Sequence, residues 1–378
     1  MLRLRTTAAI IVLLAAIAGA SALWPSAGVE VADFTAFWVA GHRLLAHENP
    51  YDATYALEVE RSMGFTAERP LVMRNPPWAL WVVLPLGALH HPGARLLWTE
   101  CLVAMLWFSA SRVWTIYGGC PRKQWIPLFV TFVFAPALAC IAVGQTAPFL
   151  LLGLTLFLYL HSGHEFWAGF ALLLTAFKPQ VAFLFWIALF LWCAENRKWR
   201  IMGGLLSSSG LATLIALLFD SHAIEHYRAM LLTESIQTQF IPTLGGFLRL
   251  RFGQAWLQLL PAIVGLGWVL TYYFRRRKSW KWKRCLPPLL LGSLLLAPYA
   301  WMEDEVVILI ALIAAAAGIK GGKYALRIAV GFVGTNIAIL ILLAFGFRVS
   351  SPSYIWTEWV WISFYWLTTK LNPGTRVP

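Results

Sequence analysis

Residues 147–194 read APFLLLGLTLFLYLHSGHEFWAGFALLLTAFKPQVAFLFWIALFLWCA. Three apolar runs, at 147–161, 165–177 and 179–194, fill almost all of this stretch, and only short polar turns separate them. A helix rises about 1.5 Å per residue, so apolar runs of this length that follow one another are typical of helices in a bilayer. The stretch predicts an all-α polytopic membrane protein.

The composition of the whole chain supports this prediction. Of its 378 residues, 60% are hydrophobic and only 12% are charged, and the mean hydropathy is +0.68. A soluble domain carries roughly 25% charged residues, and its core cannot hide this much apolar side chain from water, whereas a bilayer can. The 21 Trp and 24 Phe also fit, because aromatic side chains gather at membrane interfaces.

Apolar runs recur along the rest of the chain. They lie near 7–24, 96–117, 125–143, 201–219, 254–274, 286–301, 305–319, 325–346 and 354–369. With the three runs quoted above, they predict a bundle of about twelve transmembrane helices in one integral membrane domain over residues 1–378. The run 7–24 is expected to stay as the first helix, although Ala20-Ser21-Ala22 also resembles a signal-peptide cleavage site.

The net charge of +13 indicates which loops face the cytoplasm. The cations cluster at 197–200 and 275–284, and further ones lie at Arg122-Lys123 and in the C-terminal tail. Short basic loops between apolar runs are typical cytoplasmic anchors. The charge therefore predicts a multi-pass protein of the cell (plasma or inner) membrane that contacts membrane lipids, and it does not call for a nucleic-acid partner.

This orientation collects the unusual polar residues on the outer side. They fall in a first outer loop at 25–77, in a second at 220–250, and in turns at 144–145, 178–179 and 303–305. The stretch 78–89 is too short to cross about 30 Å of hydrocarbon, so we expect it to enter the membrane and return. If it crosses instead, 165–194 becomes one broken helix and Arg122-Lys123 moves outside.

The first outer loop carries a candidate catalytic residue, Asp33. Six residues after it repeat at helical spacing: Phe34, Phe37, Trp38, Gly41, Leu44 and Leu45. The repeat predicts an amphipathic interfacial helix that ends at Asn49-Pro50. Asp33 at its start can cap the helix, or act as a catalytic base at the membrane surface, and the two roles do not exclude each other.

Two outer turns place polar residues within apolar sequence. Lys178 ends the run 165–177, where it is either a lysine that snorkels to the interface or a ligand for phosphate. Gln145 follows Gly144 in a tight turn, where it either caps the turn or hydrogen-bonds a ligand.

Two further outer segments are polar. Glu303-Asp304-Glu305 is either an acidic loop or a cleft wall that binds sugar hydroxyls, orients an acceptor or holds a cation. Arg74, just before the stretch 78–89, can meet a substrate phosphate or an ordinary lipid head group.

The sequence contains no motif of several other classes. It has no Walker loop, no GxGxxG and no GxSxG, and its five cysteines form no CxxC pair. His222 and His226 share a helical face but do not form an HExxH motif. We therefore expect no metal site and no cofactor, and dependence on a divalent cation stays open.

In order and spacing, these segments resemble glycosyltransferase family 87, whose members have the GT-C membrane fold and include polyprenol-phosphate-mannose-dependent mannosyltransferases. The likeness runs through 33–34, 44–45, 48–52, 76–77, 84–86, 144–145, 168–169, 178–179, 298–299 and 304–307. The chain departs from the pattern at three places. His47 replaces a usual glycine, Asn75 replaces a common aromatic residue, and Met302-Glu303 replaces a frequent histidine or aromatic.

The resemblance implies roles for individual residues. In GT-C enzymes an acidic residue of the first outer loop commonly serves as general base or donor-site carboxylate, and this role falls on Asp33. The remaining candidates are substrate-binding residues: Gln145, Lys178, Asp304, Arg74, Tyr299, Asn49 and Tyr51.

The expected activity is inverting transfer of a hexose, with mannose as the leading sugar, from a polyprenyl-phosphate donor at the outer face. Asp33 would deprotonate a hydroxyl of a glycolipid or glycan acceptor, and Lys178 would stabilise the departing phosphate, with Arg74 as a second candidate.

Two alternatives remain. A transporter or flippase would be indicated by inverted repeats, and none is apparent in the sequence. A non-catalytic subunit of an envelope assembly would tolerate replacement of Asp33.

Overall fold

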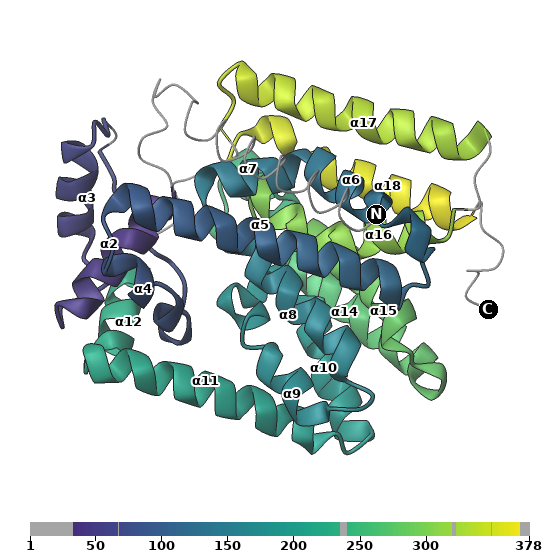
Figure 1. Ribbon diagram of the computed structural model, residues 1–378, viewed down its shortest axis with the longest axis horizontal. Coiled ribbons are helices and arrows are strands. Elements are labelled where there is room, and N and C mark those ends of the chain that lie inside the picture. The colour runs from purple at the N-terminus through teal and green to yellow at the C-terminus, as the bar shows by residue number, and fades with distance from the viewer. Residues whose placement is uncertain (1–32, 67, 235–239, 320–322, 349, 371–378) are drawn as a thin grey trace. The chain divides into compact units, whose positions relative to one another are not determined.

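The computed structural model describes residues 33–370 apart from 67, 235–239, 320–322 and 349. All the regular secondary structure in this part of the chain is helical, as predicted (Figure 1). The predicted first helix at 7–24 lies outside the described residues.

The chain divides into two compact units. The first contains the described residues up to Ala104 together with Ile141–Gln145 and Leu211–Glu234. The second contains Met105–Cys140, Thr146–Gly210 and the described residues from 240 onward. Asp33 and Gln145 therefore belong to the first unit, and Lys178 and Asp304 belong to the second.

The helix predicted from the spacing of apolar residues after Asp33 organises the first unit. It is α2 (Asp33–Leu45), and it buries Phe34, Phe37 and Leu44. α2 packs against α4 (Leu84–Gly87), which follows the 3-10 helix η1 (Pro77–Val82). The stretch 78–89 thus folds as two short helices, neither of which could cross a bilayer, and α4 covers part of the apolar face of α2.

Two glycines permit this contact between α2 and α4. A Cβ atom built on Gly41 would lie 2.2 Å from the carbonyl oxygen of Val83, and one built on Gly87 would lie 2.2 Å from the carbonyl carbon of Gly41. The two backbones touch directly, so neither position has room for a side chain.

The chain turns after α2 at His47, which has a φ of 59°. This left-handed conformation favours glycine, which explains why a glycine is usual here in the family that the sequence resembles. The His47 ring makes contacts that a glycine could not. Its Nδ1–H donates to the carbonyl oxygen of Phe219 at 2.8 Å, and it stacks on the Phe219 ring at a centroid distance of 5.6 Å.

The segment that follows is stabilised by local polar contacts. The Asp52 carboxylate caps α3 (Ala53–Ser62) by accepting hydrogen bonds from the Thr54 and Tyr55 N–H groups. The Arg43 guanidinium pairs with Asp52 at 3.0 Å and with Glu48 at 2.6 Å. Asp52 and Glu48 therefore order the segment between α2 and α3.

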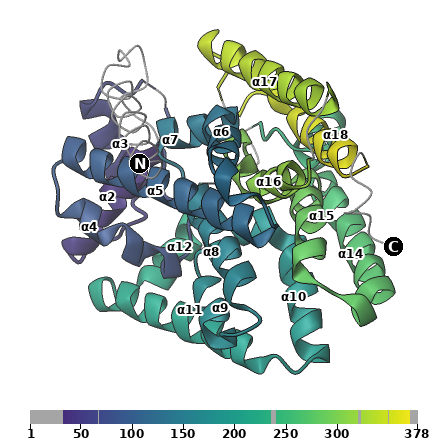
Figure 2. The same cartoon turned by 45° about the vertical axis from the view of Figure 1, so that its right-hand side comes forward.

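The other helices of the two units follow in chain order. They are α5 (His91–Ile116), α6 (Trp125–Val133), α7 (Ala135–Val143), α8 (Ala147–Leu160), α9 (Glu165–Ala171), η3 (Thr175–Phe177), η4 (Pro179–Ala182), α10 (Phe183–Glu195), α11 (Trp199–Phe219), α12 (Ala223–Thr233), α13 (Leu244–Phe252), α14 (Leu260–Arg276), α15 (Trp282–Leu295), η8 (Met302–Ile308), α16 (Leu309–Ala317), α17 (Lys323–Ala344) and α18 (Thr357–Lys370). Within the second unit α15, α16 and α18 lie side by side, and α10 packs against α14 and α15 (Figure 2).

Several of these helices are long and apolar enough to cross a membrane. Four qualify singly, namely α5, α11, the segment Ala255–Ser279 and the segment Tyr324–Ala344. Two bent pairs raise the number to six: Pro121–Val133 with Ala135–Val143, at 62°, and Glu165–Phe177 with Pro179–Glu195, at 117°. The second bend confirms the predicted turn at Lys178-Pro179. The described chain therefore has the apolar helices of a membrane-embedded protein, with four to six candidate spans where the apolar runs predicted about twelve.

We predict that Gly41→Ala lowers the free energy of unfolding by about 1–3 kcal/mol, because the added methyl group forces α2 away from α4. Thermal unfolding of the purified protein in detergent measures the change. Gly93→Ala is the matched control, since a Cβ atom there meets nothing within 4 Å. If both variants unfold at the wild-type temperature, the close contact at Gly41 is not required.

Candidate functional site

The first unit brings Asp33 and Gln145 into contact. The Gln145 Nε2 atom donates a hydrogen bond to Oδ2 of Asp33 at 2.6 Å, and the two residues are 112 positions apart. Gln145 is buried, and Asp33 is half-buried in the first turn of α2. The Gln145 amide therefore helps to orient the Asp33 carboxylate.

Gly144 explains why Gln145 reaches α2. Its φ of 79° is in the left-handed region, and a Cβ atom built on it would lie 2.6 Å from the Cβ atom of Phe34. The Gly144 carbonyl accepts a hydrogen bond from the Trp98 indole N–H at 2.7 Å. The tight turn predicted here is thus confirmed, and it is held directly against the start of α2.

A second carboxyl group, which was not among the predicted site residues, lies near Asp33. Glu60, on α3, is fully buried, and its carboxylate oxygens accept the Leu71 N–H at 3.0 and 3.2 Å. Burial raises the pKa of Glu60 to about 7, the Leu71 hydrogen bond opposes this, and the charge of Asp33 adds to it. Glu60 lies four residues after Ala56, on the same buried face of α3. A residue at such a position is usually apolar, so nothing in the local sequence indicated a buried carboxyl group here.

Three other predicted site residues of the first unit connect its loops. Tyr51 is buried and donates its hydroxyl hydrogen to the Asn75 carbonyl at 2.9 Å, and Oδ1 of Asn49 accepts the Tyr51 N–H at 2.9 Å. Arg74 donates to the carbonyl oxygen of Glu234. The backbone of Asn75 provides the acceptor for Tyr51, so this contact does not require an aromatic residue at position 75.

In the second unit, Lys178 and Asp304 form an ion pair. The Lys178 ammonium lies 2.7 Å from Oδ1 of Asp304, and the two side chains are only 10% and 0% exposed. The other carboxylate oxygen of Asp304 accepts the Trp301 N–H at 3.1 Å. Both oxygens of Asp304 are thus engaged within the protein, whereas Lys178 keeps a small exposed area.

The Trp301 side chain also faces this ion pair. The Lys178 ammonium lies 5.7 Å from the centre of the Trp301 ring, and the Tyr299 ring lies 5.9 Å from the same ring. An aromatic face attracts a cation, so Trp301 helps to hold Lys178 in place. Trp301 was not among the predicted site residues, and only its position next to Glu303-Asp304-Glu305 could have suggested it.

The segment that carries Asp304 is held on its C-terminal side by α18. The Glu305 carboxylate accepts a hydrogen bond from the Thr357 hydroxyl and another from the Trp361 indole N–H at 2.7 Å. Glu305 therefore binds a different element from its neighbour Asp304, although both belong to η8. Two of the three acids, which were expected to form an acidic loop or a cleft wall, thus make separate structural contacts.

The same segment is also held on its N-terminal side. The Gln258 amide donates to the Pro298 carbonyl at 2.9 Å, and the buried Arg249 donates to the Gln258 side-chain oxygen at 2.8 Å. Tyr299 and Trp301 are thus placed by contacts at both ends of the segment.

Among the described residues, no three His, Cys, Asp or Glu side chains are grouped as a metal site would require.

A family model described as glycosyltransferase family 87 matches residues 74–298, more than half of the chain. The chain belongs to glycosyltransferase family 87. The family indicates a membrane glycosyltransferase, in agreement with the apolar helices. The matched region includes Arg74, Gln145 and Lys178, whereas Asp33 and Asp304 lie outside it. A search of curated proteins and a search of solved structures each found no match.

We predict that Lys178→Met costs about 3–5 kcal/mol of stability, because it leaves the buried Asp304 carboxylate without its partner. The double variant Lys178→Met, Asp304→Leu should recover part of this loss in the same thermal unfolding assay. Lys198→Met is the control, since Lys198 pairs with Glu165 at a half-exposed site and should cost less than about 1 kcal/mol. An equal loss in both single variants would contradict a special role for the buried pair.

We also predict a pH dependence that arises from Glu60. Its pKa of about 7 in the folded protein exceeds the ordinary value of 4.5, so the unfolded chain releases this proton first as the pH rises. As the pH rises from about 4.5 to about 7, the stabilising contribution of Glu60 should therefore decrease. From about pH 5 to about pH 8 it should fall by roughly 2 kcal/mol or more, at about 1.4 kcal/mol per pKa unit.

Glu60→Gln should remove this loss, whereas the exposed Glu58→Gln on the same helix should retain it. Thermal unfolding of the three proteins across this pH range measures the effect. A wild-type pH profile in Glu60→Gln would contradict the raised pKa.

Proposed function

We propose that this protein transfers a hexose, with mannose as the leading candidate, from a polyprenyl-phosphate sugar to a glycolipid or glycan acceptor at the outer face of the cell membrane. Membership of family 87 supports the transferase activity. The observation that carries the choice of catalytic residue is the 2.6 Å hydrogen bond between Gln145 and Asp33.

In the proposed reaction, Asp33 is the general base. Its carboxylate takes the proton from an acceptor hydroxyl while that oxygen attacks the anomeric carbon. The bond between the anomeric carbon and the phosphate oxygen breaks, and polyprenyl phosphate leaves with its electron pair. One displacement with one carboxylate as base inverts the anomeric configuration. Gln145 holds the carboxylate so that the proton acceptor is ready before the substrates arrive.

Lys178 is the proposed cation for the leaving phosphate. The Lys178 ammonium is a cation with three N–H donors, and such a group stabilises the charge that develops on a departing phosphate. In this proposal Asp304 positions Lys178, and Tyr299 and Trp301 form an aromatic wall beside Lys178.

Arg74 is a second candidate for binding the phosphate. Asn49 and Tyr51 are proposed substrate contacts of the first outer loop.

The proposed setting is a GT-C bundle of about twelve spans, in which α2 lies at the outer interface with the membrane. The outer side is supported by the positive charge of the loops at 197–200 and 275–284. The lipid-phosphate sugar is a co-substrate, and the mechanism uses no tightly bound cofactor. The transfer assay with and without a chelator tests dependence on a divalent cation.

We predict that Asp33→Asn lowers sugar transfer at least about a hundredfold, because the amide cannot accept the proton. Gln145→Ala should lower it by roughly tenfold, since only the orientation of the base is lost. The measurement is transfer of radiolabel from a polyprenyl-phosphate hexose by the purified protein. Glu58→Gln, at an exposed site on α3, is the control and should keep wild-type activity.

The outcomes separate the possible functions. Full activity in Asp33→Asn would keep the transferase assignment but move the base to another residue. No transfer by the wild-type protein, across several donors and acceptors, would favour a transporter or a non-catalytic subunit.

A further inference from the structure

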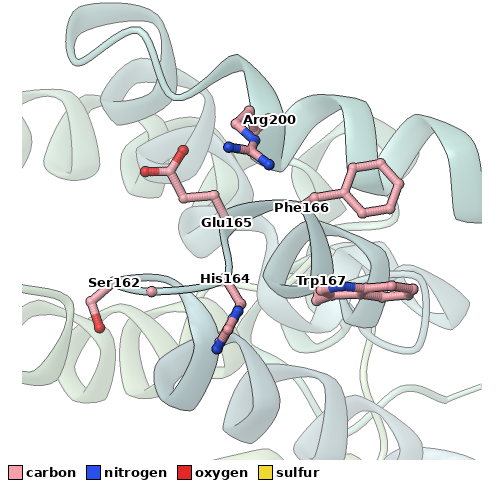
Figure 3. A pocket seen from close by; sticks show the side chains of 7 residues that line it. Ser162, His164, Glu165, Phe166, Trp167 and Arg200 are labelled. Carbon is pink, nitrogen blue, oxygen red and sulfur yellow. The ribbon is translucent and has the colours of Figure 1, made fainter.

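The second unit contains a pocket at the start of α9 and α11. Its volume is about 360 Å³, and it is lined by Ser162, Gly163, His164, Glu165, Phe166, Trp167 and Arg200. Figure 3 shows Arg200 extending from α11 over the segment that carries His164, Glu165 and Phe166. None of these residues was a predicted site residue.

Close packing of two helices builds this pocket. A Cβ atom on Gly169 would lie 1.9 Å from the Ile201 carbonyl oxygen, and one on Gly204 would lie 2.0 Å from the Phe166 carbonyl oxygen. The backbones of α9 and α11 therefore touch, as small residues allow between membrane helices. This contact places Arg200, next to Ile201, over the first turn of α9.

The charges around the pocket leave an excess of positive charge. The Glu165 carboxylate is paired with the Lys198 ammonium at 2.7 Å, which neutralises both. Arg200 has no hydrogen-bond or ion-pair partner among the residues that the structure describes. A guanidinium in this situation presents a planar donor group suited to the oxygens of a phosphate.

The surroundings of the pocket indicate a ligand in the membrane. Trp167 and Trp199 are 57% and 59% exposed, and α11 is a candidate membrane span that begins at Trp199. Exposed tryptophans at the end of a span are typical of the boundary between head groups and hydrocarbon. The loop at 197–200 is one of the basic loops predicted to face the cytoplasm, where anionic lipids attract such residues.

We propose that this pocket binds the head group of an anionic phospholipid from the inner leaflet. The Arg200 guanidinium would bind the lipid phosphate, and Trp167 and Trp199 would lie at the level of the glycerol backbone. The acyl chains would follow the exposed apolar side chains of α11, such as Leu206, which is 72% exposed. This lipid would hold the cytoplasmic ends of α9 and α11 together, away from the transfer chemistry proposed for the outer side.

The test is native mass spectrometry of the full-length protein with short-chain phosphatidylglycerol or phosphatidylcholine. The wild type should retain more phosphatidylglycerol than phosphatidylcholine. Arg200→Gln should weaken this retention about fivefold. Arg197→Gln removes the same charge three residues away, outside the pocket, and should stay near the wild-type value. Asp33→Asn should bind the lipid normally, so loss of sugar transfer and loss of lipid binding are separate results.

Three results would overturn the proposal. Equal retention of the two lipids would show that the negative head group is not recognised. Equal weakening by Arg197→Gln and Arg200→Gln would show attraction to the basic loop as a whole and not to the pocket. Displacement of phosphatidylglycerol by millimolar inorganic phosphate would show that the site takes a free anion and gains nothing from the lipid. Thermal unfolding of each variant verifies that it is folded.

Discussion

A charged or polar side chain that enters an apolar bundle must find its partner inside the protein, and this constraint decides how the irregular segments of the second unit fold. Lys178 stands at a 117° break between two helical segments and is neutralised by Asp304. Asp304 in turn accepts the Trp301 N–H, and its neighbour Glu305 is satisfied from α18. At this break the ion pair neutralises the Lys178 side chain, and the Lys178 carbonyl accepts the Val181 N–H at 3.1 Å.

In the first unit, the limiting factor is how closely two backbones can approach. Gly41 and Gly87 let α2 contact α4, and Gly144 lets the turn before Gln145 contact Phe34. The Gly144 contact holds Gln145 at the start of α2, within hydrogen-bond distance of the proposed base Asp33. A position set by backbone contact is more rigid than one set by long side chains, which suits a group that must take a proton at a defined moment.

Much of the helical architecture could be predicted from the sequence, and so could several of the turns that carry the candidate residues. α2 was expected from its apolar spacing, the turn at Gly144-Gln145 from the glycine, and the break at Lys178-Pro179 from a lysine and a proline within apolar sequence. The buried position of Glu60 could not be predicted, because its carboxylate binds the Leu71 N–H, and nothing near Glu60 in the sequence indicates that contact. The division of Glu303-Asp304-Glu305 among separate partners was equally hidden, since adjacent acids look alike until their surroundings are known.

The sequence by itself determined the class of the protein, its family and the candidate residues. Periodicity and hydropathy are local properties, and the order of motifs along the chain is a linear one, so both can be read without coordinates. Only the tertiary structure decided which candidates meet: Gln145 with Asp33 across 112 positions, and Lys178 with Asp304 across 126. Such pairs depend on how distant helices pack, because a hydrogen bond of 2.6–2.7 Å requires a placement of the two backbones that no local pattern specifies.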